Sequence, residues 1–312
     1  MSHRPAGDEP TDPLAQVRTE QRNPASERLD AMSTIEIVDL MNEQDRLVAP
    51  AVHAARLDIA RAVDLVVEAF RAGGRLFYVG AGTSGRLGVL DAAECPPTFG
   101  TDPEQVQGII AGGPPALVRA VEGAEDDPRD GAAALGQRGF GPPDLLAGIA
   151  ACGVTPFVRG ALEEARRLGA RTVMITCNPG FADLPQADVT VAVDVGPEIL
   201  TGSTRLKAGT ATKLVLNTLT TAAMVRLGKC YGNLMVDLTA TNQKLRLRSV
   251  RMLRHLCGLD DLQARRLLED AGGSLKAAIL MGRRGIGREQ AVAALEASNG
   301  VLRVALGEGD GA

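Results

Sequence analysis

The sequence predicts an α/β fold in which a doubly wound parallel sheet is preceded by helices and followed by a small helical bundle. In the middle of the chain, five short apolar runs alternate with helical stretches, which is the pattern of a parallel sheet with both faces covered. Capping signals and apolar spacing indicate helices before these runs, and the strand pattern ends beyond Gly232. With 312 residues and 45% hydrophobic content, the chain can form one large domain and a smaller appendage, so a disordered chain is excluded.

The N-terminal part is expected to hold a tail and two helices. Residues 1–18 are rich in proline and charge and have no hydrophobic period, which predicts a disordered tail. Ser33 and Glu36 have the spacing of a capping box, so a helix should run from there to about residue 47. A longer helix should extend from about Pro50 to Ala72, where two glycines end it.

The sheet domain is expected to contain five strands connected by helices. The strands are expected at Leu76 to Val79, Val106 to Ala111, Leu145 to Ala150, Thr172 to Thr176 and Val189 to Val195. The helices between them are expected at about residues 85–93, 115–122, 156–168 and 205–227.

The C-terminal part is expected to be helical. Thr241 to Leu256 has the pattern of a helix with arginines on one face, and three short helices separated by glycines should lie between Leu259 and Leu306. The chain is thereby divided into a tail at 1–18, N-terminal helices at 19–65, the sheet domain at 66–229 and a C-terminal helical region at 230–312.

Composition and charge restrict the partners. The formal net charge is −4 and basic residues never run in clusters, so neither nucleic acid nor a membrane surface is expected as a partner. The N-terminus lacks the apolar core of a signal peptide, and no stretch approaches about 18 uninterrupted apolar residues. The five cysteines lack C-x-x-C spacing, which suits free thiols in a reducing compartment. We therefore expect a cytoplasmic protein that acts on a small molecule, without a metal because no Cys/His cluster occurs.

A glycine-rich turn follows the first expected strand. Residues 80–85 (GAGTSG) lie between a strand and a helix, where backbone N–H groups and the helix dipole hold an anion. Dinucleotide sites share this glycine spacing, but they need an acidic residue at the end of the next strand, and this strand ends Ile110-Ala-Gly-Gly. The hydroxyls of Thr83 and Ser84 suit a terminal phosphate better than a bridging pyrophosphate. A merely tight turn is the alternative.

Two further strand-to-helix turns carry small polar side chains. Residues 151–156 (ACGVTP) follow the third strand and end in a proline, which favours the first turn of a helix. Gly202-Ser203-Thr204 precedes the long helix that carries Lys207. Taken alone, Ser203 and Thr204 are better explained by helix capping than by phosphate binding. Three such turns at the carboxyl edge of one sheet together favour a phosphate crevice.

Three glutamates stand out among the acidic residues. Glu94 lies in a segment, DAAECPP, that looks like an apolar helix end stopped by prolines, where a carboxylate is unexpected. Glu125 lies in VEGAED, and Glu198 precedes the third turn. Solvated surface acids are the alternative reading of Glu94 and Glu125, and none of the three histidines lies in such a turn.

Five longer segments carry a more specific resemblance. They are TEQRNP from Thr19, GAGTSGRLGVLDAAEC from Gly80, EGAED from Glu122, GPEILTGSTRLKAGTATK from Gly196 and YGNLMVDLTATNQKL from Tyr231. In this order, and from about residue 19 to the C-terminus, they resemble the N-acetylmuramic acid 6-phosphate etherase family.

The resemblance implies a sugar isomerase (SIS) domain, a C-terminal region like a ubiquitin-associated (UBA) bundle, and a homodimer with active sites near the subunit interface. It implies cleavage of the D-lactyl ether of N-acetylmuramic acid 6-phosphate with water, giving N-acetylglucosamine 6-phosphate and D-lactate, during cell-wall sugar recovery and without a cofactor. The proton donor corresponds to Glu94, and a second catalytic acid, assigned here as the base, corresponds to Glu125. Substrate and phosphate binding would fall to Gly82, Thr83, Ser84, Gly85, Cys152, Gly153, Thr155, Glu198, Ser203, Thr204 and Lys207, the last on either the phosphate or the lactyl carboxylate.

One departure from the family bears on turnover and substrate. Where the family usually reads ASGRTP, this chain reads ACGVTP at residues 151–156, so a hydroxyl and a positive charge are lost. Because Cys152 is expected at a helix N-terminus, its thiol pKa should lie below the usual value.

Two other functions remain open on the sequence. A sugar-phosphate sensor resembling the glucokinase regulatory proteins would bind without reacting, but those proteins carry two SIS domains and this chain has room for one. An aldose-ketose isomerase would also remove the C2 proton, but it needs no acid at C3.

Overall fold

The structure is a computed structural model that describes residues 17–238 and 243–309. Most of the expected tail, residues 1–16, and the first two residues of the helix expected from Thr241 lie outside the described residues. Val17 is fully buried and Arg18 begins a 3₁₀ helix, Arg18–Glu20. The packed chain therefore starts slightly before residue 19.

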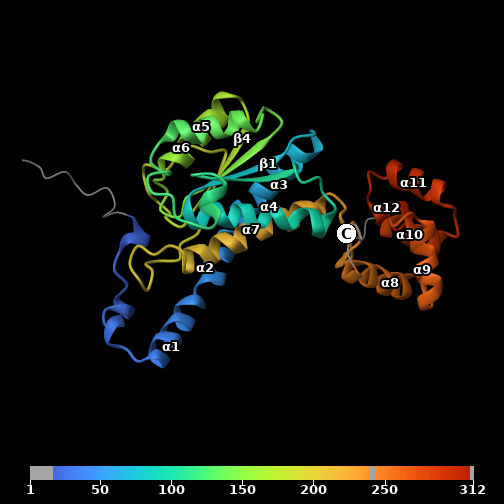
Figure 1. Cartoon of the computed structure of the whole chain (residues 1–312), viewed down its shortest axis with the longest axis horizontal. Helices are drawn as coiled ribbons and strands as arrows, with labels where there is room; N and C mark the ends of the chain where they lie inside the picture. The colour runs from blue at the N-terminus through green and yellow to red at the C-terminus, as the bar shows by residue number, and fades with distance from the viewer. Residues whose placement is uncertain (1–16, 239–242, 310–312) are drawn as a thin grey trace, which may run out of the picture.

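The centre of the molecule is a five-stranded parallel sheet, which confirms the predicted strands (Figure 1). Its strands are β1 (Leu76–Gly80), β2 (Val106–Ile110), β3 (Leu145–Ile149), β4 (Arg171–Thr176) and β5 (Val189–Ala192). They lie in the order β2-β1-β3-β4-β5. Strand β1 lies between β2 and β3, so its Leu76 pairs with Val106 on one side and with Leu145 on the other.

Helices cover both faces of the sheet, which explains why the strands are almost continuously apolar. The side chains of Leu76 and Tyr78 pack against α3 (Arg56–Arg71), α4 (Gly82–Phe99) and α7 (Lys207–Arg226). Phe77 and Val79 point to the opposite face, beneath α5 (Pro128–Gln137) and α6 (Pro156–Arg167). Alternate residues of one strand thus fill two separate cores.

The N-terminal region has the predicted capping box, but the second predicted helix is divided in two. Ser33 caps α1 (Thr34–Asp45), and the Glu36 side chain accepts a hydrogen bond from the Ser33 amide at 2.7 Å. The helix expected from Pro50 to Ala72 is instead two helices, α2 (Val48–Ala54) and α3, which meet at Ala55. Figure 1 shows α1 projecting away from the sheet domain.

Helix α4 is longer than predicted. We expected a helix at 85–93 that prolines would stop, but α4 continues through Pro96 and Pro97 and ends at Gly100, whose φ is +61°. Cys95 and Phe99 are buried in the core on this side of the sheet. Their packing offsets the missing proline N–H groups, since tertiary contacts override local helix preference.

The helix expected at 115–122 was misplaced. That segment holds only a 3₁₀ helix, Pro114–Leu117, and the real helix is α5, which Asp127 caps through the Arg129 amide at 2.8 Å. Helix α5 packs on α6 through two glycines. A Cβ on Gly131 would lie 1.9 Å from the Phe157 carbonyl oxygen, and one on Gly160 would lie 1.9 Å from the Pro128 carbonyl oxygen. Only glycine permits so close an approach of the two helices.

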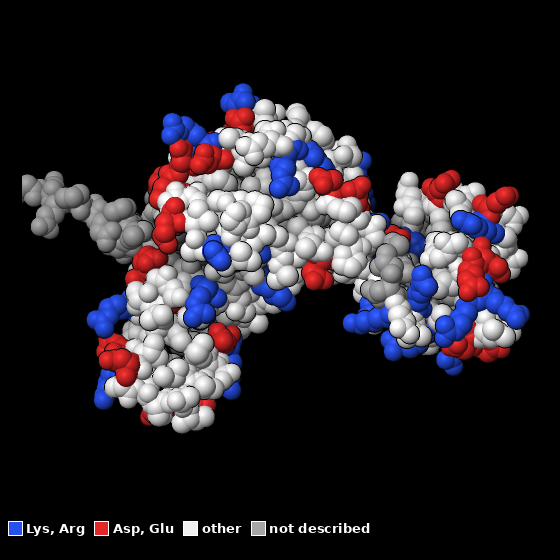
Figure 2. Space-filling model, viewed as in Figure 1, with Lys and Arg blue, Asp and Glu red and all other residues white. Residues whose placement is uncertain are grey.

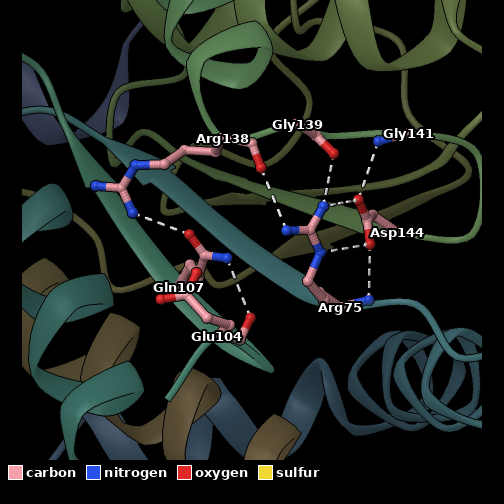
Figure 3. A network of polar contacts seen from close by, with 7 residues as sticks. All are labelled: Arg75, Glu104, Gln107, Arg138, Gly139, Gly141 and Asp144. Carbon is pink, nitrogen blue, oxygen red and sulfur yellow. Dashed lines mark hydrogen bonds and ion pairs between the residues drawn. The ribbon is translucent and has the colours of Figure 1, made fainter. Parts of the chain in front are cut away.

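A polar cluster ties the amino ends of three strands together (Figure 3). The Arg75 guanidinium donates to both carboxylate oxygens of Asp144, from Nε to Oδ1 at 3.1 Å and from the terminal nitrogen to Oδ2 at 2.8 Å. It also bonds to the carbonyl oxygens of Arg138 and Gly139, and the Arg138 guanidinium bonds to Gln107 at the start of β2. These contacts hold together the amino ends of β1, β2 and β3, at the edge opposite the glycine-containing turns.

A buried carboxylate joins the two helices beneath the sheet. Asp91 of α4 accepts hydrogen bonds from Asn217 at 2.6 Å and Thr220 at 3.3 Å, both on α7, and from the Tyr78 hydroxyl at 3.0 Å. Burial raises the pKa of the Asp91 carboxyl, and the three donors only partly offset this effect.

The C-terminal region has a core of its own. A short hairpin of β6 (Cys230–Tyr231) and β7 (Leu234–Met235) precedes the helices, so strand structure continues past Gly232, contrary to expectation. The buried Lys276 donates to Asp237 and to the Gly300 carbonyl oxygen, both at 2.8 Å, and fastens this segment to the helices. Between Leu259 and Leu306 there are four helices rather than three: the region comprises α8 (Gln243–Cys257), α9 (Asp261–Asp270), α10 (Leu275–Arg284), α11 (Arg288–Ala297) and α12 (Leu302–Ala305).

Basic side chains gather on α8, as its arginine spacing predicts. Lys244, Arg248 and Arg251 line one groove together with Leu247. Figure 2 shows Lys and Arg side chains concentrated around this part of the C-terminal region, whereas the sheet domain carries both signs of charge.

Candidate functional site

The strand order places a crevice between two of the predicted turns. In an open parallel sheet, ligands bind at the carboxyl edge where the strand order reverses. Here the reversal lies between β1 and β3, because the chain runs outward from β1 to β2 on one side and from β3 to β5 on the other. The turns that follow β1 and β3 are residues 81–85 and 150–155. The two glycine-containing turns therefore face each other across the switch point.

The first turn is held close against the sheet. Thr83 and Ser84 lie in the first turn of α4, beside its unpaired N–H groups. Gly82 has a φ of +51°, which favours glycine. A Cβ on Gly85 would lie 2.6 Å from the Gly80 carbonyl oxygen, so only glycine fits there. The turn thus opens the N-terminus of an 18-residue helix, where backbone N–H groups and the helix dipole favour negative charge.

The second turn combines Cys152, Gly153 and Thr155. Gly153 has a φ of +85°, and Thr155 is the N-cap of α6. Cys152 lies three residues before the N-cap and its carbonyl oxygen accepts a hydrogen bond from Asn178 at 3.3 Å. Burial raises the pKa of the Cys152 thiol, and donors at Val154 and Thr155 only partly oppose this. The expected lowering of this pKa is therefore wrong, because the residue sits outside the first helical turn and is half-buried.

The third turn adjoins the first. A Cβ placed on Gly209, in the first turn of α7, would lie 3.5 Å both from Thr83 Cγ2 and from the Thr204 carbonyl oxygen. Thr83 and Thr204 thus both lie close to the same glycine. Ser203 and Thr204 are half-buried, and neither hydroxyl caps α7.

Glu198 and Lys207 form a buried support rather than an open ligand pair. The Glu198 carboxylate accepts hydrogen bonds from the amides of Lys207 at 3.1 Å and Ala208 at 2.9 Å, so it caps α7. The Lys207 ammonium donates to Gln44 at 2.8 Å. Burial raises the pKa of Glu198 and lowers that of Lys207. Both groups hold the third turn in place, and the structure brings them to each other and to Gln44.

Glu125 lies beside the turns at the switch point. Its side chain is exposed, and its carbonyl oxygen accepts a hydrogen bond from the Phe157 amide at 3.0 Å, in the first turn of α6. Glu125 and Gly82 line the same cavity, which has a volume of about 210 Å³. The structure therefore brings Glu125 together with the first turn and with the helix that follows the second.

Glu94 lies away from these turns within the same chain. It follows Gly82 by twelve residues in α4, so at roughly 1.5 Å per residue the two are about 18 Å apart along the helix. Its side chain is exposed, so the apolar surroundings inferred from its neighbours in the sequence are absent. Glu94 does not line the cavity that Gly82 and Glu125 share.

Two side chains at the site were not singled out from the sequence. Arg86 lines the cavity shared by Gly82 and Glu125. Asn178, which is buried, links Cys152 to the N-terminal segment, because its side-chain oxygen accepts a hydrogen bond from the Arg18 amide at 3.1 Å. Arg86 follows GAGTSG directly, so its place just after a phosphate-type loop was the available signal.

Metal and membrane signals are absent from the part of the chain that the structure describes. No three His, Cys, Asp or Glu side chains there come together as a metal site would require. No described helix has both the length and the apolar character needed to cross a bilayer.

Known proteins share the sequence over nearly its whole length. The model of the glucokinase regulatory protein N-terminal SIS domain matches residues 58–166, which identifies the sheet domain as SIS-type. A protein of Gloeobacter violaceus named N-acetylmuramic acid 6-phosphate etherase is 57% identical over 292 residues, covering 94% of this chain and 95% of the relative. Proteins of the same name from Symbiobacterium thermophilum and Rhodopirellula baltica are 57% and 54% identical, each covering 86% of this chain and 89% of the relative. The chain therefore belongs to the N-acetylmuramic acid 6-phosphate etherase family.

Proposed function

We propose that the protein cleaves the D-lactyl ether of N-acetylmuramic acid 6-phosphate, giving N-acetylglucosamine 6-phosphate and D-lactate. The observation that carries this proposal is the 57% identity over 94% of the chain to a protein of that name. The position of Glu125 beside the switch-point turns supports it, because the reaction needs a carboxyl group next to a bound sugar phosphate. A sensor or an isomerase is not favoured, since the relatives are named for ether cleavage.

The chemistry requires a base and an acid and needs no cofactor. In the ring-opened sugar, the C1 aldehyde acidifies the C2 proton, which a base removes while the C3–O bond breaks. The leaving lactate oxygen takes a proton from a general acid. Water then adds to C3 and a proton returns to C2, which restores the sugar. We assign the base to Glu125 and the acid to Glu94.

The phosphate is proposed to lie in the crevice between the first two turns. Backbone N–H groups at the starts of α4 and α6 and the hydroxyls of Thr83, Ser84 and Thr155 are the donors there. Ser203 and Thr204 would complete the wall beside Thr83. Glu198 and Lys207 would act by holding the third turn rather than by touching the phosphate.

We propose that Glu94 acts in the site of a partner subunit within a homodimer. Its distance of about 18 Å from its own first turn leaves it no role there. Leu90, four residues before Glu94 in α4, has an exposed fraction of 52%. Ile35, on the projecting helix α1, has an exposed fraction of 64%. Large exposed apolar side chains on a projecting helix are typical of an interface between subunits. A homodimer would cover them and bring Glu94 to the neighbouring crevice.

The proposal includes a cytoplasmic location and a role in recycling cell-wall sugars. The five cysteines are all free, which suits a reducing compartment. The separate core of the C-terminal helices supports the division of the chain into N-terminal helices, a SIS domain at 66–229 and a helical region from residue 230.

Release of D-lactate tests the function directly. Purified protein is incubated with N-acetylmuramic acid 6-phosphate, and D-lactate is measured with a stereospecific dehydrogenase. Release of D-lactate together with N-acetylglucosamine 6-phosphate is expected. Conversion to a ketose phosphate would indicate an isomerase, and tight binding without any reaction would indicate a sensor.

A further inference from the structure

The cavity between the first turn and the loop after β2 contains a positive charge that the phosphate crevice does not use. Arg86, the fifth residue of α4, lines it with Gly82 and Glu125. The Arg86 Nε donates a hydrogen bond to the Leu117 carbonyl oxygen at 3.2 Å, which fixes the guanidinium against the opposite loop. Within the described residues Arg86 makes no ion pair, so its two terminal nitrogens remain as donors.

The size and lining of the cavity define what it can hold. Its volume of about 210 Å³ is below the roughly 300–1,000 Å³ of sites that enclose a whole small molecule. Much of the remaining wall is five alanines and Val121. A small group that carries both a methyl and an anionic head therefore fits better than a sugar ring.

We propose that this cavity is the subsite for the D-lactyl group and that Arg86 binds its carboxylate. The inference rests on the proposed function, in which the lactyl ether is the bond that breaks. The terminal nitrogens of an arginine bind a carboxylate through two parallel hydrogen bonds. The lactyl methyl group packs on the alanines. The sugar ring lies across the first turn, with its phosphate in the crevice on the other side.

This placement also accounts for the charges around Glu125. Glu122 and Glu125 line the same cavity, so an incoming carboxylate meets two negative charges. Like charges disfavour one another, and a cation is needed to offset them. Arg86 is the cation among the described residues of this lining. It binds the substrate's carboxylate beside Glu125 and leaves that residue able to accept the C2 proton.

Comparison of substrate with product separates this role from phosphate binding. N-acetylglucosamine 6-phosphate shares the phosphate and the sugar but lacks the lactyl group. In Arg86→Gln, we expect the Michaelis constant for N-acetylmuramic acid 6-phosphate to rise roughly tenfold to a hundredfold, since a hydrogen-bonded charge is lost. The inhibition constant of N-acetylglucosamine 6-phosphate should stay within about twofold of the wild-type value. The Michaelis constant of Arg86→Lys should lie between those of the wild type and Arg86→Gln, because lysine keeps the charge but cannot form two parallel hydrogen bonds.

Two further variants test whether the effect of Arg86→Gln comes from a disturbed loop rather than from lost substrate contacts. Arg119→Gln removes an exposed arginine two residues beyond Leu117 and outside the cavity lining, and it should change neither constant. Ala120→Leu leaves Arg86 and its bond to Leu117 in place but fills the cavity from an exposed position, and it should weaken substrate binding without weakening product binding.

The outcomes distinguish this inference from the proposed function. If Arg86→Gln weakens the binding of substrate and product equally, Arg86 acts on the phosphate or on the loop instead. If neither binding constant changes, Arg86 is not part of the site. Either result, in a wild-type protein that releases D-lactate, overturns the lactyl subsite alone. Failure of the wild-type protein to release D-lactate would overturn the proposed function. In that case, calorimetric titration of the same variants with both sugar phosphates still shows whether Arg86 binds the lactyl group.

Discussion

The amide nitrogen of Phe157 lies 3.0 Å from the carbonyl oxygen of Glu125, and this hydrogen bond fastens the loop after β2 to the first turn of α6. Phe157 is buried, so the bond has a rigid donor. The Glu125 side chain takes no part in it and is exposed. Substitutions of that side chain should therefore change chemistry without moving the loop.

Hydrogen exchange at C2 should separate the roles of the two glutamates. If Glu125 is the base, Glu125→Gln should stop exchange of the C2 hydrogen with heavy water, because no group removes the proton. Glu94→Gln should still allow exchange, since proton removal does not require lactate to leave. Proton NMR of the sugar in heavy water measures both, and the reverse pattern would exchange the two assignments.

Mixed dimers should show whether Glu94 and Glu125 come from different subunits. Each single glutamine variant should lose at least about a hundredfold in D-lactate release, the usual contribution of a general acid or base. After equal amounts are unfolded, mixed and refolded, random pairing of two-fold dimers should restore about a quarter of wild-type activity. The restored sites combine Glu94 from one subunit with Glu125 from the other.

The control for that experiment is each variant taken through the same procedure alone, which should remain inactive. A mixture that remains inactive, although native mass spectrometry of differently tagged chains shows mixed dimers, would place both residues in one subunit's site or remove Glu94 from catalysis.

Cys152 should be slow to alkylate. Burial raises the pKa of its thiol, so at about pH 7 we expect iodoacetamide to label it more slowly than a free cysteine peptide. Cys95 and Cys177, whose thiol pKa values burial raises to about 12, should stay unlabelled in the folded protein and serve as internal references. Mass-spectrometric mapping over time measures all three, and rapid labelling of Cys152 would show that its thiolate is stabilised.

The hydroxyl missing at residue 152 should matter for affinity. A thiol is a weak hydrogen-bond donor, so Cys152→Ser should lower the Michaelis constant by roughly tenfold, with a smaller effect on turnover. Cys257→Ser, which changes a half-buried thiol in the C-terminal region, is the matched control and should leave the constant unchanged. An equal response of the two variants would remove Cys152 from the phosphate site.

Asp91 should make stability depend on pH in a defined direction. Burial raises its pKa in the folded state above the unfolded value of 3.8, so the folded protein takes up this proton at a higher pH than the unfolded chain does. Its contribution to stability is fully present below pH 3.8 and is lost as pH rises through the folded-state pKa. The difference in unfolding free energy between wild type and Asp91→Asn should therefore fall with rising pH in this window and then become constant.

Denaturant unfolding of the two proteins at a series of pH values measures this difference. Asp30→Asn, at an exposed residue, should show no such trend against the wild type. A difference between wild type and Asp91→Asn that grows with rising pH would mean that the three donors to Asp91 outweigh its burial.

The strands and the three turns could be predicted because their signals are local. A run such as Leu145 to Ile149 is apolar throughout only when both faces of a strand are covered, and glycine with small polar residues marks the turns that follow. The end of α4 could not be predicted in this way. Pro96 and Pro97 are local signals to stop, but burial of Phe99 against the core outweighs them.

The distance of Glu94 from the crevice could not be predicted, for a different reason. The sequence shows that Glu94 follows the first turn, but its distance from that turn depends on whether the intervening residues are helical or folded back. Arg86 was overlooked because its significance comes from the loop after β2, which faces it across the cavity. Such pairings across the fold have no fixed spacing along the chain.

The close contact of α5 and α6 at Gly131 and Gly160 restricts how the sequence of this protein can evolve. Neither residue lines the cavity beside Glu125, yet any side chain at either would push α6 away from α5. Phe157, which holds the loop of Glu125, lies one turn before Gly160. In a library of all single substitutions, grown under selection for use of the sugar, we expect these two helix positions to be as intolerant as Glu125, the proposed base. Enzymes that drift in sequence at this pair should have to alter both helices together or lose the reaction.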